Sequence, residues 1–102
     1  MDIKQFQQDV KALSQQLGTT TPERRIMYLV SELGEVVDEV IDFINSDATS
    51  DMQDEIKTRI GLEIYDLIWN AVDLANQLDI DLAEAFEAKS AFNAKRKWKH
   101  RG

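Results

Sequence analysis

The sequence predicts one all-α domain spanning residues 1–102, folded as a four-helix bundle. Apolar residues recur at steps of three and four along nearly the whole chain, which is the period of helices with one buried face. One proline and four glycines leave little material for the tight turns of a β-rich domain. Three short polar or glycine-containing segments divide the apolar pattern into four helices.

The first two helices are predicted from their apolar faces and from the residues at their ends. Residues 3–17 carry one apolar stripe, and Gly18 is a typical residue just after a helix C-terminus. Thr21 is then a preferred N-cap, and Pro22 is favoured at the first helical position. The second helix is therefore predicted from Pro22 to about Asn45. The stripe of the first helix consists of Ile3, Phe6, Val10, Leu13 and Leu17.

The other two helices follow polar segments that supply capping residues. The stretch "NSDATSD" reads as a loop in which Asp51 caps a long third helix that continues to about Leu78. Asp81 is followed three residues later by Glu84, the spacing of a capping box. We therefore expect the fourth helix to begin after Asp81 and to end near Trp98.

Charge and composition exclude several classes of function. The formal net charge is −7, with 19 acidic and 12 basic residues, which argues against binding to a nucleic-acid polymer or to an anionic membrane. There is no cysteine, so neither disulfides nor thiolate chemistry are available. No apolar run approaches the roughly 20 residues that span a bilayer, and the first residues lack a signal-peptide core. We expect a soluble cytoplasmic protein.

Two pairs of acidic residues with the same three-residue spacing stand out. Glu32 and Glu35 lie on the second predicted helix, and Glu63 and Asp66 lie on the third. On helical wheels each pair falls within about 60°, along the edge of its helix's apolar stripe. Packing of the two stripes would therefore bring the four carboxylates together. For the second helix, the residues expected in that core are Ile26, Leu29, Leu33, Val36, Val40 and Ile44.

Neighbouring carboxylates repel one another and have raised pKa values unless cations neutralise them. Four carboxylates without histidine or cysteine suit hard cations such as Mg²⁺ or Mn²⁺. The sole histidine, His100, lies in the C-terminal tail, which disfavours the Glu-x-x-His pattern of di-iron bundles. The spacing alone is equally consistent with solvated acids on ordinary amphipathic helices.

The motifs together resemble a known family. "SELGE" supplies the first acidic pair, "LEIYD" supplies the second, and "LDIDLAEA" and "KSAFNAKR" follow in order. Over residues 22–98 this pattern is similar to the MazG-like all-α nucleoside triphosphate pyrophosphohydrolases, whose superfamily includes dimeric dUTPases and phosphoribosyl-ATP pyrophosphatase. Ile64 and Tyr65 stand where many members have a small residue, and "RKW" replaces a frequent Arg-Tyr-Pro ending. These departures put the base pocket and the subunit contacts in question.

The resemblance implies both a site and a reaction. Glu32, Glu35, Glu63 and Asp66 would hold Mg²⁺, which Mn²⁺ can replace, and would form the catalytic centre. The substrate would be a canonical or aberrant (deoxy)nucleoside triphosphate, cleaved to the monophosphate and pyrophosphate in a housecleaning role. The implied assembly is a homodimer or a dimer of dimers. The residues leave open whether one of these four acids or Glu39 accepts the proton from water.

Substrate contacts are expected from the fourth helix and from one aromatic residue. Lys89, Asn93 and Arg96 are spaced by four and three residues, so they share one face and could bind phosphate or sugar. The alternative is a basic helix end that complements the helix dipole. Trp69 either stacks on a base or belongs to a subunit interface. That interface would be a second apolar strip on the third helix, made of Leu62, Tyr65, Trp69 and Val72.

Two competing hypotheses remain beside the pyrophosphohydrolase. One is a noncatalytic helical module for oligomerisation or partner binding, which would be indifferent to Mg²⁺. The other keeps the enzyme but changes its substrate to phosphoribosyl-ATP or to dUTP and dUDP.

Overall fold

The computed structural model describes residues 2–18, 20–47 and 49–101, with side chains as far as Arg96. Helices account for all the regular secondary structure in these segments, which confirms the all-α prediction. The side chains of Trp98 and His100 lie outside the described residues. The four helices are α1 (Ile3–Leu17), α2 (Pro22–Ile44), α3 (Ser50–Gln77) and α4 (Leu82–Arg101).

Capping explains where the first two helices begin and end. Thr21 accepts a hydrogen bond from the Arg24 backbone N–H at 3.2 Å, with Pro22 in the first turn, as predicted. Gly18 ends α1 with φ of 98°, a left-handed value that favours glycine. Asp2 caps the start of α1 by accepting from the Gln5 backbone N–H at 2.7 Å.

The start of α3 differs from the prediction. Thr49 is the N-cap, and its hydroxyl accepts from the Met52 backbone N–H. Asp51 instead lies in the first turn, where its charge favours the positive end of the helix dipole. Both residue types cap helices well, so the sequence alone did not distinguish them. Asp81 caps α4 as predicted, accepting from the Glu84 backbone N–H at 3.2 Å.

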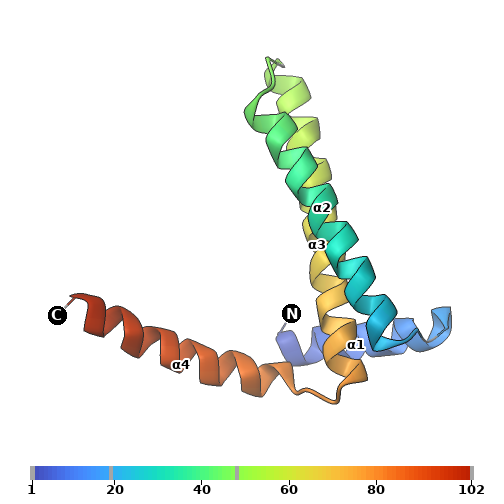
Figure 1. Ribbon diagram of the computed structural model, residues 1–102, viewed down its shortest axis with the longest axis vertical. Coiled ribbons are helices and arrows are strands. Elements are labelled where there is room, and N and C mark those ends of the chain that lie inside the picture. Colours follow the sequence, from blue (N-terminus) through green and yellow to red (C-terminus); the bar gives the residue numbers. More distant parts are fainter. Residues whose placement is uncertain (1, 19, 48, 102) are drawn as a thin grey trace.

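The helices form an antiparallel pair with one helix across its base and another extending away (Figure 1). The pair consists of α2 and α3, which make the most extensive helix contact in the molecule. Helix α1 crosses the base of the pair against α3, and α4 contacts α1 while pointing away from α2 and α3. The four helices therefore do not close into one bundle within a single chain.

A small core lies where α1 meets α3. Val10 on α1 and Val72 and Ala75 on α3 are its buried apolar residues within the described chain. The Phe6 and Tyr65 rings meet edge to face with centroids 6.1 Å apart. Helix α1 thus covers part of the strip that was predicted to be a subunit interface, because Val72 is buried within the chain.

Gln7 holds three elements together at this base. Its side-chain amide donates to the Ile80 carbonyl at 2.7 Å and accepts from the Leu82 backbone N–H at 3.1 Å. Its backbone carbonyl accepts from the Asn76 side chain at 3.1 Å. These bonds fix the turn between α3 and α4 against α1, and so set the direction in which α4 leaves the base.

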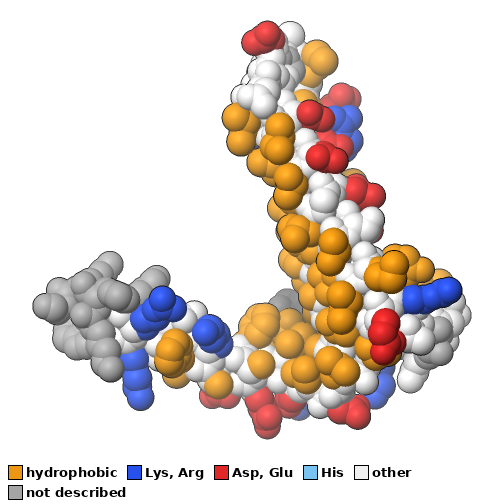
Figure 2. Space-filling view, viewed as in Figure 1, with side chains coloured by type: hydrophobic (Ala, Val, Ile, Leu, Met, Phe, Trp, Pro, Cys, Tyr) orange, Lys and Arg blue, Asp and Glu red, His pale blue; other side chains and the backbone are white. Residues whose placement is uncertain are grey.

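The predicted core of α2 is only partly buried. Leu29, Val36 and Val40 are shielded on the side that faces α3, whereas Leu33 is 50% exposed and Ile44 is 71% exposed. Ile26 is likewise half-exposed. The expectation that these last three belong to the core is wrong for the single chain, because α3 covers only one side of α2. Figure 2 shows apolar side chains running along the pair on the side toward α4.

Within the described segments, none of the helices combines the length and the apolar character needed to cross a bilayer.

Candidate metal centre

Polar side chains enter the contact between α2 and α3 at regular intervals. On α2 they are Arg25, Glu32 and Glu39, each seven residues apart. Seven residues are about two helical turns, so all three point to the same side of α2. Residues of α3 meet each of them, and the result is three polar layers. We name these the Arg25 layer, the acidic layer and the Arg59 layer.

The Arg25 layer is buried and its charges are balanced. The Arg25 Nε lies 2.8 Å from the Asp73 Oδ2, with side chains only 11% and 3% exposed. The guanidinium also donates to the Asn70 side-chain oxygen, and the Asn70 amide donates to the Asp66 carbonyl at 2.8 Å. The same guanidinium lies over the Trp69 ring at 5.3 Å and over the Tyr28 ring at 5.5 Å.

The Arg59 layer is also charge-balanced. The Arg59 Nε lies 3.5 Å from the Glu39 Oε2. This pair is more exposed than the Arg25 pair, so it contributes little to stability. Its importance is that Glu39, which the sequence left open as a proton acceptor, already has a cationic partner.

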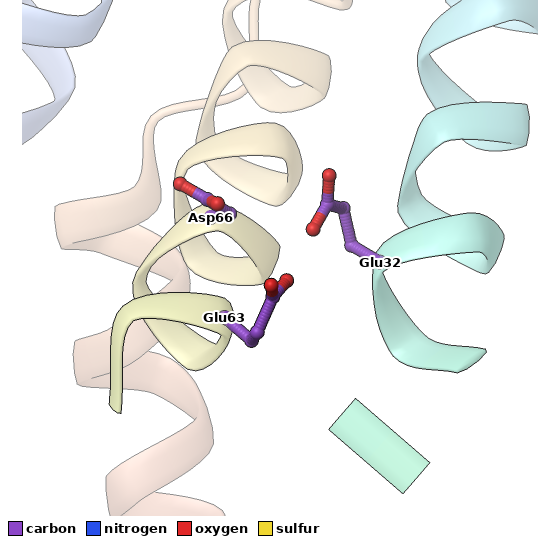
Figure 3. Close-up of side chains that lie close together, drawn as sticks. All are labelled: Glu32, Glu63 and Asp66. Atoms are coloured by element: carbon purple, nitrogen blue, oxygen red, sulfur yellow. The ribbon is translucent and has the colours of Figure 1, made fainter. Parts of the chain in front are cut away.

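The acidic layer between them contains carboxylates from both helices. Glu32 on α2 faces Glu63 and Asp66 on α3, and one oxygen from each lies within 4.8 Å of the others (Figure 3). Glu32 and Glu63 are partly buried, whereas Asp66 is exposed. The Oε2 atoms of Glu32 and Glu63 are shielded from solvent and have no hydrogen-bond donor in the described chain. This layer therefore concentrates negative charge where the layers on either side are neutralised.

The pKa values in the acidic layer reflect this crowding. The adjacent Glu35 carboxyl, burial, and the neighbouring Glu32 raise the pKa of Glu63 to about 7. Burial and the charges of Glu35 and Asp66 raise the pKa of Glu32, although the proximity of the Glu63 carboxyl opposes the shift. Glu35 thus lies close enough to influence both pKa values, beside the three acids that the structure brings together.

The donor set fits a divalent cation. The layer offers only carboxylate oxygens, the ligands preferred by Mg²⁺ and Mn²⁺. The two shielded oxygens without donors are the atoms that a cation would satisfy. The exposed Asp66 and Glu35 leave one side open for a ligand with further oxygen atoms.

The predicted substrate-binding residues lie elsewhere. Lys89, Asn93 and Arg96 are exposed on α4, which leads away from the α2–α3 pair (Figure 1). The Lys89 Nζ lies 4.8 Å from the centroid of the Phe92 ring on the same helix. Trp69 is partly buried against Arg25, one layer from the acids.

Sequence reasoning missed the role of Arg25. Nothing in the sequence analysis assigned a cationic partner to Asn70 or Asp73. The available signal was the seven-residue spacing between Arg25 and Glu32, which puts both side chains on the face toward α3.

No protein-family model, curated protein or solved structure matches this chain.

Proposed function

We propose that the protein is a Mg²⁺-dependent nucleoside triphosphate pyrophosphohydrolase of the MazG-like kind. The observation that carries this proposal is the acidic layer, in which Glu32, Glu63 and Asp66 converge from two helices between two charge-balanced layers. The motif resemblance over residues 22–98 supplies the reaction class, and the layer supplies a matching site. Mn²⁺ replaces Mg²⁺, and the working form is a homodimer or homotetramer.

Glu32, Glu35, Glu63 and Asp66 would hold the cation. When bound, Mg²⁺ supplies neutralisation of phosphate charge and activation of water. The chain needs this help, because its net charge of −7 otherwise repels a triphosphate. In the reaction, a water oxygen attacks the α-phosphorus and the bond to the bridging oxygen breaks. The products are the nucleoside monophosphate and pyrophosphate.

Glu35 is the best-placed acceptor for the proton that this water loses. It is exposed beside the acidic layer and lies close enough to Glu63 to raise the pKa of that residue. Glu39 is less suitable, because its carboxylate is paired with Arg59. A general base within hydrogen-bond reach of the attacking water is what this step requires.

The competing function is a noncatalytic oligomerisation module, and the half-exposed apolar residues of α2 favour it. The two functions differ in their response to metal. A module would keep its assembly and stability unchanged in excess chelator. Phosphoribosyl-ATP and dUTP remain alternative substrates for the enzyme, so they belong in the test panel.

The test is pyrophosphate release from a panel of nucleoside triphosphates that includes phosphoribosyl-ATP and dUTP, with Mg²⁺ and with excess chelator. We expect metal-dependent release that Glu63→Gln lowers by about 100-fold or more. Glu55→Gln is the matched control, because Glu55 is an exposed acid on the same helix, and it should retain full activity. Absence of release across the panel would overturn the proposal.

A further inference from the structure

Asn70 connects the acidic layer to the Arg25 layer. Its side-chain oxygen accepts a hydrogen bond from the Arg25 guanidinium, and its side-chain amide donates to the Asp66 backbone carbonyl at 2.8 Å. Because a guanidinium only donates and a carbonyl only accepts, these two partners fix the orientation of the Asn70 amide. One buried side chain therefore contacts both the cation of one layer and a residue that supplies a carboxylate to the other.

Helix formation and apolar packing do not explain an asparagine at this position. Asn70 lies in the interior of α3 (Ser50–Gln77), where asparagine forms helix less well than alanine or leucine. It is only 8% exposed, and a buried amide needs hydrogen-bond partners. Arg25 and Asp66 supply those partners. The residue is therefore explained by the two layers that it connects.

Arg25, at the other end of this connection, is restricted by contacts of several kinds. Its Nε lies 2.8 Å from the Asp73 Oδ2, and its guanidinium lies over the Trp69 ring at 5.3 Å and the Tyr28 ring at 5.5 Å. The planar guanidinium offers several donors in a fixed geometry, so it can serve Asp73 and Asn70 together. Arg25 thus holds α2 against two residues of α3 at once.

The acidic layer requires the two helices to be held together beside it. One oxygen each from Glu32, Glu63 and Asp66 lies within 4.8 Å of the others. Carboxylates this close repel one another when no cation is bound, so they act to separate α2 from α3. Arg25 opposes this separation from a position seven residues before Glu32, about 10 Å along α2. The Arg59 layer on the other side is more exposed and holds the helices less strongly.

We propose that Arg25 is a positioning residue of the metal centre. It holds α2 to α3 beside the acids and, through Asn70, fixes the turn of α3 that carries Asp66. The carboxylates are then arranged before a cation arrives, and its binding does not have to draw the helices together. The inference rests on the cation site of the proposed function, but not on the reaction.

Arg25→Met combined with Asp73→Leu tests this role without leaving a buried charge unpaired. Apolar replacement of a buried ion pair often costs little stability, so urea unfolding should stay close to wild type. The Mn²⁺ dissociation constant, measured by calorimetric titration of metal-free protein, should rise about 10-fold or more, as when outer-shell partners of metal ligands are removed. The net charge is unchanged, so a long-range charge effect does not account for weaker binding. Wild-type affinity in this folded variant would overturn the proposal.

Asn70→Ala covers the case in which the double variant does not fold. It keeps the ion pair and removes the link to Asp66, and alanine favours the helix. Mn²⁺ binding should weaken several-fold, and wild-type affinity would overturn the proposal. Arg24→Met is the matched control, because Arg24 is the exposed neighbour of Arg25, and it should not weaken binding. An equal loss in Arg24→Met would contradict a specific role for Arg25.

Arg25→Lys separates geometry from charge. Lysine keeps a positive charge beside Asp73, but its single ammonium lacks the planar set of donors that serves Asp73 and Asn70 together. Its affinity for Mn²⁺ should therefore lie between those of wild type and the double variant. An Arg25→Lys protein that binds Mn²⁺ as tightly as wild type would contradict the proposed geometry.

Pyrophosphate release distinguishes failure of this inference from failure of the proposed function. A wild type that binds Mn²⁺, loses affinity in these variants and yet hydrolyses no substrate would refute the reaction and support the positioning role. A wild type that releases pyrophosphate, beside variants that bind Mn²⁺ equally well, would refute the positioning role alone. A wild type that binds no Mn²⁺ would overturn both.

Discussion

Arg25 and Asp73 form a buried ion pair one layer away from Glu32 and Asp66, the acids that face each other across the same two helices. The pair shows that a carboxylate buried between α2 and α3 is neutralised where a cationic side chain lies next to it. Asp73 is only 2% exposed, and the guanidinium balances its charge. The acidic layer lies between the same two helices as the Arg25 layer and also contains carboxylates. Among the described residues, however, no arginine forms an ion pair with Glu32, Glu63 or Asp66.

Replacing Arg25 by methionine should destabilise the protein strongly. The change leaves the Asp73 carboxylate buried without a counter-charge, and breaking such a pair costs about 3–5 kcal/mol. Urea denaturation at a fixed protein concentration measures the loss. Arg24→Met is the control, since Arg24 is exposed, and it should change the free energy of unfolding by less than about 0.5 kcal/mol.

Combining Arg25→Met with Asp73→Leu should recover most of that loss. Apolar residues of similar volume often replace a buried ion pair at little cost. If Arg25→Met alone cost no more than Arg24→Met, the buried pair would not stabilise the helix contact.

Metal-free protein should lose stability as the pH rises from about 4.5 to about 7. A carboxyl group whose pKa is raised on folding binds its proton more tightly in the folded state, so its contribution is complete below the unfolded pKa. That contribution disappears as the pH passes the folded pKa, which is about 7 for Glu63. Thermal unfolding in chelator across this range measures the slope.

Glu63→Gln should flatten this slope, because the titrating group is gone. Glu55→Gln removes an exposed acid from the same helix and should leave the slope unchanged. A wild-type melting temperature that stays constant or rises between pH 5 and 7 would contradict the repulsion inferred for the acidic layer.

Mn²⁺ should stabilise the protein more at pH 8 than at pH 6. The cation and the proton compete for the same carboxylates, so the apparent affinity rises with pH. At 100 times the dissociation constant, a ligand that binds only the folded state adds about 2.7 kcal/mol. Thermal unfolding with and without Mn²⁺ at the two pH values checks this. Equal shifts at both values would indicate binding outside the acidic layer.

Gln7→Ala should loosen the start of α4 while leaving the α2–α3 pair intact. The change removes the bonds from the Gln7 amide to Ile80 and Leu82, and it leaves a carbonyl and an N–H without their partners. Amide hydrogen exchange should accelerate around residues 80–85. Gln8→Ala, an exposed neighbour, should have no such effect. Unchanged exchange in both variants would show that other contacts fix the turn.

Much of the fold could be predicted from residue types and their positions along the chain. The extent of α1 and the caps at Thr21 and Asp81 followed from residue type and position alone. The start of α3 was misplaced because Thr49 and Asp51 cap equally well. The departure of α4 from the helix pair depends on long-range bonds such as those of Gln7, which no local pattern encodes.

The acidic site was predictable for a different reason. Spacing of three residues on each helix put the carboxylates on one edge, and antiparallel packing of the two helices brought the edges together. Burial was harder to predict, because Ile26 and Leu33 have the periodicity of core residues yet face away from α3. Periodicity identifies an apolar face without showing whether the rest of its own chain covers it.

Electron paramagnetic resonance of Mn²⁺ with metal-free protein tests the central claim most directly, since free and bound Mn²⁺ give separate signals. We predict that wild type and Glu55→Gln bind Mn²⁺ alike at pH 8, that Mg²⁺ displaces it, and that Glu63→Gln and Asp66→Asn lose most of the bound signal. No bound Mn²⁺ in wild type, or equal binding by all four proteins, would contradict a cation site between α2 and α3.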